Sequence, residues 1–146
     1  MIIPDVNLLL YAHIDAFAHH AVARAWWEET LTSAEVGLPA VSIFGFVRIA
    51  TNRRVFTTPM AVAAASGLVE SWLRRPNVRV LPGGRVHVEL ALGFLTELGV
   101  AGNLTTDAQL AALALEHRAT VATNDTDFAR FPGVRLVNPL SNPAGR

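Results

Sequence analysis

The segment MIIPDVNLLLY, residues 1–11, carries a short apolar run into a single carboxylate. Ile2 and Ile3 predict a first strand, and Pro4 suits an edge strand or the last position of a strand. Asp5 follows where extended chain gives way to a predicted helix, for which it is a suitable N-cap. Carboxylates at strand ends bind cations in many folds, but they also cap helices, so Asp5 alone distinguishes neither role.

The composition predicts one globular domain. The chain has 146 residues, of which 51% are hydrophobic and 16% charged, enough for a sizeable core and too few for a second domain of ordinary size. We expect the domain to span residues 1–140, followed by a flexible tail over 141–146. The opening apolar run is interrupted by Pro4, Asp5 and Asn7 and has no basic region before it, so it resembles neither a signal peptide nor a membrane span. A cytoplasmic protein is therefore expected.

Charge and cysteine content exclude several classes of function. The formal net charge is zero, so any basic surface for a nucleic-acid partner must come from local clustering. All twelve basic residues are Arg, whose planar guanidinium suits phosphate and carboxylate groups. The absence of Cys removes thiolate zinc sites, disulfides and cysteine nucleophiles.

Apolar periodicity and turn residues predict short strands that alternate with helices. The expected strands are 2–3, 78–81, 120–122 and 134–137, and the segment 32–39 is expected to be a loop, with a short strand as an alternative. The expected helices are 5–12, 18–31, 40–51, 58–73, 85–98 and 108–117. In the helix over 40–51, the apolar stripe is expected at Val41, Phe44 and Val47, with Phe46 as a further candidate. This alternation predicts an α/β protein with a mostly parallel sheet.

Four of the five Asp residues fall at predicted junctions between strands and helices. Asp5 and Asp125 follow strands, Asp107 opens a helix, and Asp127 lies two residues beyond Asp125. In an open parallel sheet, sites form beyond the carboxyl ends of the strands, so these side chains are expected to converge.

Each of these acids also has an ordinary structural explanation. Asp5, Asp107 and Asp127 can be N-caps or first-turn acids, and Asp125 can form an Asx turn, each contributing about 1 kcal/mol. For one acid alone that explanation is favoured, whereas for the set we favour a metal site. Mg²⁺ and Mn²⁺ prefer carboxylate and water ligands, and beside a phosphodiester such an ion activates water and neutralises phosphate charge. The set therefore indicates hydrolysis by a nuclease.

Three segments resemble the PIN-domain toxins of bacterial VapBC systems, especially the mycobacterial type. They are DVNLLLYA (5–12), GFVRIATNRRVF (45–56) and GNLTTDAQLAALALEHRATVATNDTDFARFPGVRLVNPL (102–140). The resemblance implies a three-layer α/β/α sandwich with a central, mostly parallel sheet. It also implies a toxin that is a Mg²⁺- or Mn²⁺-dependent endoribonuclease, usually a homodimer, silenced by a cognate VapB-type antitoxin. Both tRNA and ribosomal RNA are open as substrates.

The resemblance also assigns expected roles residue by residue. Asp5, Asp107 and Asp125 match the catalytic metal-binding acids. The residues expected to hold these ligands or contact phosphate are Asn7, Thr123, Asn124 and Arg48, the last in a basic cluster with Arg53 and Arg54.

The chain departs from the family at one position of the middle helix. Many PIN domains place a Glu three residues before an Arg, where this chain has Gly45 before Arg48. Asp127 is the nearest compensation, as a further metal ligand. The missing Glu and the neutral charge leave one alternative, a degenerate PIN domain that binds RNA or protein without catalysis. A phosphoacceptor receiver domain fits less well, because such domains usually need a late Lys.

Overall fold

The centre of the molecule is a five-stranded parallel sheet with the strand order β3-β2-β1-β4-β5. The structure is a computed structural model, and it describes residues 1–141. The strands are β1 (Ile2–Pro4), β2 (Val36–Pro39), β3 (Val78–Leu81), β4 (Thr120–Ala122) and β5 (Arg135–Val137). The first strand of the sequence therefore lies in the middle of the sheet, between β2 and β4.

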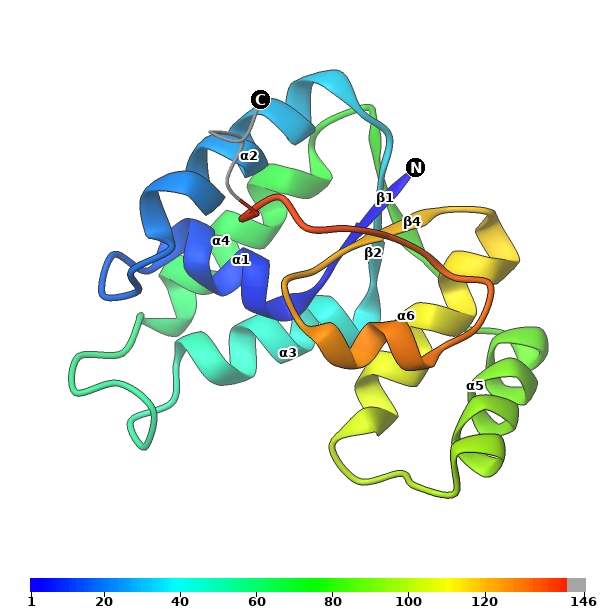
Figure 1. The fold of residues 1–146 in the computed structure, drawn as a ribbon. Coiled ribbons are helices and arrows are strands. Elements are labelled where there is room, and N and C mark those ends of the chain that lie inside the picture. Colours follow the sequence, from blue (N-terminus) through cyan, green and yellow to red (C-terminus); the bar gives the residue numbers. More distant parts are fainter. Residues whose placement is uncertain (142–146) are drawn as a thin grey trace.

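Helices cover both faces of this sheet, which makes three layers (Figure 1). They are α1 (Val6–His13), α2 (His20–Ser33), α3 (Ala40–Ala50), α4 (Val62–Leu73), α5 (Arg85–Leu98) and α6 (Leu104–His117), with a 3₁₀ helix η1 (Thr126–Arg130). Helices α1 to α4 pack on one face, and α5 and α6 pack on the other. The predicted α/β/α sandwich is thus confirmed.

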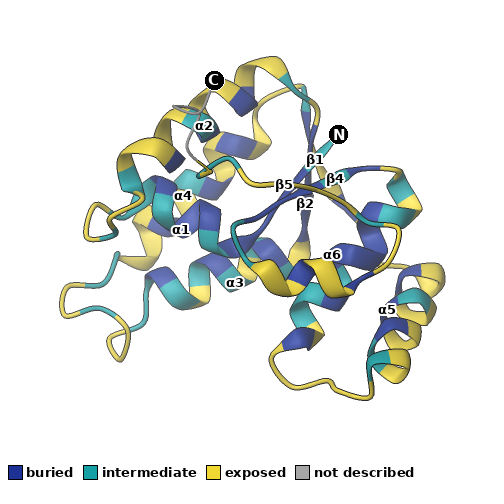
Figure 2. Ribbon diagram, in the orientation of Figure 1, coloured by how far each residue is buried: buried dark blue, intermediate teal, exposed yellow. Residues whose placement is uncertain are grey.

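Each face of the sheet has its own apolar core (Figure 2). The first core is rich in aromatic rings, and Trp72 contacts both Trp27 and Phe46 in it. The second is built largely from the Ala and Leu side chains of α6 with Phe94, Phe128 and Phe131. Because α6 is apolar nearly all round, it fills the space between the sheet and α5.

Pro4 ends β1, and its alternative placement on an edge strand was wrong. Proline lacks a backbone donor, which would interrupt the ladder of a central strand. Here Pro4 is the last strand residue, paired with Ala122, and the ladder continues through the Asp5 N–H, which donates to the Ala122 carbonyl over 2.8 Å. The chain then turns directly into α1.

The largest differences from the sequence predictions are the starts of two helices and the apolar face of a third. Helix α6 begins at Leu104, so Asp107 lies in its first turn and does not precede it. Helix α4 begins at Val62, because the Met60 N–H donates to the Ala50 carbonyl at the end of α3 and holds the preceding segment against that helix. In α3, Phe46 is the fully buried aromatic, whereas Phe44 faces solvent.

After β5 the chain makes a turn at Asn138, whose side chain accepts a hydrogen bond from the Leu140 N–H. Leu140 packs against the first core. The expected flexible tail falls almost wholly on residues 142–146, which lie outside the described residues. Among residues 1–141, no helix is both long enough and apolar enough to cross a membrane.

Candidate metal centre

Asp5 occupies the N-cap position of α1, but its side chain does not cap the helix. The residue is only 5% exposed, and its Oδ2 accepts a hydrogen bond of 2.9 Å from the Thr123 hydroxyl. The simple capping explanation therefore fails for Asp5. Its carboxylate is instead fixed to the residue that follows the neighbouring strand.

The parallel pairing of β1 with β4 makes this contact possible. Pro4 pairs with Ala122, so Asp5 and Thr123 leave the sheet side by side at its carboxyl edge. Thr123 is anchored by its own N–H, which donates to the Val137 carbonyl over 2.9 Å. Its hydroxyl oxygen also accepts from the Asp125 N–H over 3.0 Å. One buried hydroxyl therefore connects Asp5 to the loop that carries Asp125.

Asp107 approaches the same edge from the first turn of α6. Burial, together with the nearby charges of Asp5, Asp125 and Asp127, raises the pKa of Asp107 to about 7. Burial likewise raises the pKa of Asp5, against the lowering effect of the Thr123 hydrogen bond and nearby backbone N–H groups. Asp107 is thus close enough to the other three acids for their charges to act on it, and Asp5 is close enough to Asp125 for the same effect.

Asp125 keeps the ordinary structural role that its sequence allowed. Its Oδ1 accepts a hydrogen bond of 2.9 Å from the Asp127 N–H, which caps η1 and forms an Asx turn. This turn uses only Oδ1 of the Asp125 carboxylate. Asp127 lies exposed in the first turn of η1. Capping and cation binding are compatible at Asp125, because a carboxylate has two oxygens.

A cavity of about 520 Å³ opens beside Asp5 and Asp107. Its polar wall includes Asn7 and Thr106, and its other wall is the face of α3 that carries Phe44, Gly45 and Arg48. The volume lies within the roughly 300–1,000 Å³ typical of ligand pockets. Neither Phe44 nor Thr106 was predicted as a site residue. The signal for Phe44 was its place four residues before Arg48, which puts both side chains on one helix face.

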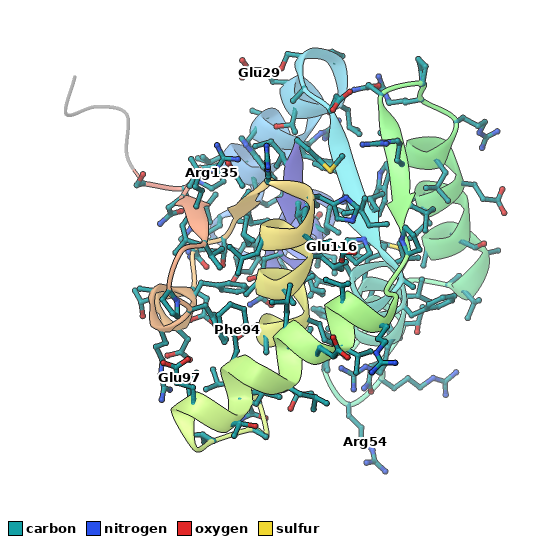
Figure 3. All side chains as sticks on the ribbon, turned by 90° about the vertical axis from the view of Figure 1, so that its right-hand side faces the viewer. Glu29, Arg54, Phe94, Glu97, Glu116 and Arg135 are labelled. Carbon is teal, nitrogen blue, oxygen red and sulfur yellow. The ribbon has the colours of Figure 1, made fainter. Side chains whose placement is uncertain are left out.

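The remaining predicted residues lie at different distances from this cavity. Asn7, half-buried in α1, and the exposed Arg48 both line it, whereas Asn124 is half-buried in the loop between Thr123 and Asp125. Arg53 and Arg54 follow α3 in an exposed turn and do not line the cavity. Figure 3 shows Arg54 extending away from the body of the protein.

The four acids have the ligand chemistry that a hard divalent cation prefers, but their side chains do not surround a single point. Within residues 1–141, no three Asp, Glu or His side chains are close enough to form a ready-made metal cage. Mg²⁺ does not require one, because it usually retains several waters and binds through one or two carboxylates. Residues 1–141 form two ion pairs, Arg24–Glu28 and Arg85–Glu89. Neither pair includes one of the four acids, so within these residues the acids have no Arg partner. A cation would relieve their mutual repulsion.

A larger cavity, of about 600 Å³, lies away from the acids. It is formed by the end of α1, by α2 and by the segment after α3, and its lining includes His13, His20 and Asp15. Burial lowers the pKa of His13, whose Nδ1 is 2.8 Å from the Leu9 carbonyl oxygen. None of the four predicted metal acids lines this cavity.

The sequence is similar to known ribonucleases over nearly its whole length. It is 48% identical to Ribonuclease VapC33 of Mycobacterium tuberculosis, across 96% of this chain and 99% of that protein. It is 39% identical to Ribonuclease VapC37 of the same organism, across 95% of this chain and 97% of that protein.

Solved structures with the same fold come from toxin–antitoxin complexes. VapBC2 from Rickettsia felis, bound to a DNA fragment from its promoter, matches with a TM-score of 0.68 and 19% identity over 94% of this chain and 98% of the other. FitAcB from Neisseria gonorrhoeae matches with a TM-score of 0.68 and 22% identity over 97% of this chain and all of the other. The model of the PIN domain family matches residues 2–134. The chain therefore belongs to the PIN domain family.

Proposed function

We propose that this protein is a divalent-metal-dependent endoribonuclease and the toxin of a toxin–antitoxin pair. One observation carries the proposal. Asp5, Asp107 and Asp125 come from three separate segments to one edge of the sheet, where burial and mutual repulsion raise the pKa of Asp107 to about 7. Such an arrangement is costly for folding, and perturbed carboxylates of this kind cluster at functional sites. The similarity to proteins named ribonucleases supports the same activity.

In this proposal Asp5, Asp107 and Asp125 hold Mg²⁺ or Mn²⁺, with Asp127 as a further ligand at the open side. A bound ion would supply the charge that neutralises the phosphate and the acidity that activates water. The protein's own task is to hold the carboxylates in place and keep them deprotonated. Thr123 does so for Asp5, because its hydroxyl donates to the ionised carboxylate and so favours that form.

Arg48 is proposed to bind the RNA phosphate at the mouth of the cavity. Its guanidinium suits bidentate contact with phosphate oxygens. Arg48 lines the same cavity as Asp5 and Asp107, so a phosphate bound there would lie between the guanidinium and the metal held by these acids. Asn7 and Asn124 are proposed to donate amide hydrogen bonds to the carboxylates or to the phosphate. Residues of this kind fix ligands that would otherwise rotate.

The proposed partners are a VapB-type antitoxin, an RNA substrate and a second copy of the chain. The solved structures of similar fold include complexes named VapBC, which supports an antitoxin. The proposed substrate is tRNA or ribosomal RNA, and an enzyme that cuts either of them in the cell acts in the cytoplasm.

The test is cleavage of total RNA by the purified chain, free of antitoxin, with Mg²⁺, with Mn²⁺ and with a chelator. The proposal expects defined new RNA ends with either metal and none with the chelator. Cleavage that continues at the same rate in the chelator would show that the activity is not that of this site.

A further inference from the structure

We propose that Phe44 is a platform on which a base of single-stranded RNA stacks beside the scissile phosphate. The inference deepens the proposed ribonuclease function and rests on it. It assigns a substrate-binding residue to the α3 wall of the cavity.

Phe44 is unusual among the aromatic residues of this protein. The chain has seven Phe, three Trp and one Tyr, all within the described residues, and Phe44 alone among them is exposed, at 69%. It takes part in none of the aromatic pairs found among residues 1–141, whereas Phe46, two positions on, contacts Trp72 in the core. A single exposed apolar residue is ordinary on a protein surface, so exposure alone decides nothing.

The exposure of Phe44 is relevant to substrate binding because of where the residue lies. Phe44 and Arg48 are four residues apart on α3, so their side chains share one face of the helix, and both line the cavity that contains Asp5 and Asp107. An unpaired nucleotide has the same two parts, an apolar ring face and an anionic phosphate. A phosphate held between Arg48 and the metal acids would leave its attached base next to Phe44.

Gly45 supplies the space that a base needs at this wall. A Cβ atom at Gly45 would lie 3.2 Å from Val6 Cγ2, so any larger side chain there must occupy the cavity or displace Val6. Because Gly45 has no side chain, the cavity wall beside Phe44 is formed there by backbone atoms alone. The residue that departs from the family pattern therefore leaves room next to the exposed ring.

A base in a duplex cannot use this platform, because its faces are already stacked. Stacking on an aromatic side chain requires a splayed or single-stranded base, and it tolerates any sequence because every base has a π face. Phe44 is thus expected to select unpaired RNA and to contribute little to the choice of base.

The test measures binding separately from cleavage. The probe is a mixed-sequence 12-nucleotide single-stranded RNA with 2-aminopurine at successive positions, bound to the Asp107→Asn protein so that it is not cut. Phe44→Ala is expected to weaken binding about 5- to 150-fold, the range for one base–aromatic stack, and to abolish the quenching of 2-aminopurine. Phe44→Trp should retain both. Val62→Ala on α4 is the matched control, since Val62 is 66% exposed and does not line the cavity.

Several results would overturn the inference. Phe44→Leu keeps apolar bulk without a ring, so full binding and quenching by this variant would mean that stacking is not involved. Binding by Phe44→Ala at the level of the parent protein would exclude the platform. A fall in molar mass of Phe44→Ala by light scattering would assign the ring to contact with a second copy instead.

The same experiment separates this inference from the proposed function. If the protein with Asp107 intact cleaves RNA with metal and Phe44→Ala binds and cleaves equally well, only the inference fails. If the protein binds and cleaves no RNA under any condition, both fail.

Discussion

The Thr123 hydroxyl donates a hydrogen bond to Asp5 Oδ2 over 2.9 Å and joins two residues that are 118 positions apart in the chain. The same oxygen accepts from the Asp125 N–H, so one buried side chain spans the ends of β1 and β4. This contact explains how a carboxylate that is only 5% exposed is held in one orientation without capping its own helix. It also makes the geometry of the site depend on a residue that is not itself charged.

Replacing Thr123 tests that dependence. Thr123→Val keeps the shape of the side chain but removes the donor to Asp5 and the acceptor for the Asp125 N–H. We expect Mn²⁺ affinity, measured by calorimetry, to fall about 10- to 100-fold, as for other residues that orient metal ligands. Thr123→Ser keeps the hydroxyl and should restore most of the affinity. Equal affinity of the Val variant and the parent would show that the hydrogen bond does not position Asp5.

Removal of the Asp107 charge is expected to stabilise the metal-free protein at neutral pH. The pKa of Asp107 is about 7 in the folded state against an ordinary value of 3.8, so the folded state binds more protons between these limits. The stability contributed by this group is therefore full below about pH 4 and is lost as the pH rises to about 7. At pH 8, Asp107→Asn should raise the free energy of unfolding by about 1–2 kcal/mol, a value discounted for partial exposure.

Urea unfolding at pH 4 and pH 8 in a chelator measures this effect. The Asn variant should differ little from the parent at pH 4 and should be the more stable protein at pH 8. Saturating Mn²⁺ should reduce the advantage, because metal stabilises the folded parent. A variant that is less stable at pH 8 would show that Asp107 is not destabilised by its neighbours.

Metal binding should also displace the proton of Asp107 where that group is protonated. A carboxylate must lose its proton before it binds a cation, so Mn²⁺ binding near pH 6 is expected to release close to one proton and near pH 8 almost none. Affinity should rise over the same interval. Calorimetry in buffers of different ionisation enthalpy measures the released protons, and Asp107→Asn should release fewer. Proton release that is unchanged in the variant would assign the titration to another group.

Because position 45 carries no carboxylate, replacing Gly45 with Glu is expected to increase metal affinity. Gly45→Glu adds a carboxylate to the cavity wall, and cation sites bind more tightly as ligand charge increases. We expect Mn²⁺ affinity to rise by on the order of tenfold, with some loss of stability from the close contact with Val6. Gly45→Gln is matched in size and lacks the charge, so it should show the stability loss without the gain. A similar gain in both variants would contradict the electrostatic explanation.

Much of the fold could be predicted from the sequence because its local signals agree with its packing. Strand β3 and helix α5 have the predicted bounds, since Pro76, Pro82 and the left-handed Gly99 end these elements by backbone geometry alone. The start of α4 could not be predicted. It depends on a tertiary contact, the hydrogen bond from the Met60 N–H to the Ala50 carbonyl. Locally, Thr58 followed by Pro59 is a pattern typical of a helix start, and this pattern predicted the earlier boundary.

The candidate site shows the same division between local and tertiary information. The acids could be found because each lies at a strand or helix end, which is visible in the sequence. Their coupling could not be quantified, because the pKa of Asp107 depends on burial and on charges from other segments. The exposure of Phe44 was also hidden, since Phe44 and Phe46 are equally apolar and only the packing of α3 decides which of them is buried.

We propose that Asp5, Asp107 and Asp125 act together as the metal-binding acids of a ribonuclease. The most direct measurement is the Mn²⁺-dependent rate of RNA cleavage by four variants, each Asp→Asn at position 5, 107, 125 or 15. Asp15 is the matched control, an exposed Asp that lines the other cavity. We expect a loss of at least about 100-fold for the first three and the parental rate for Asp15→Asn. Full activity of Asp5→Asn or Asp107→Asn in a folded protein would contradict it.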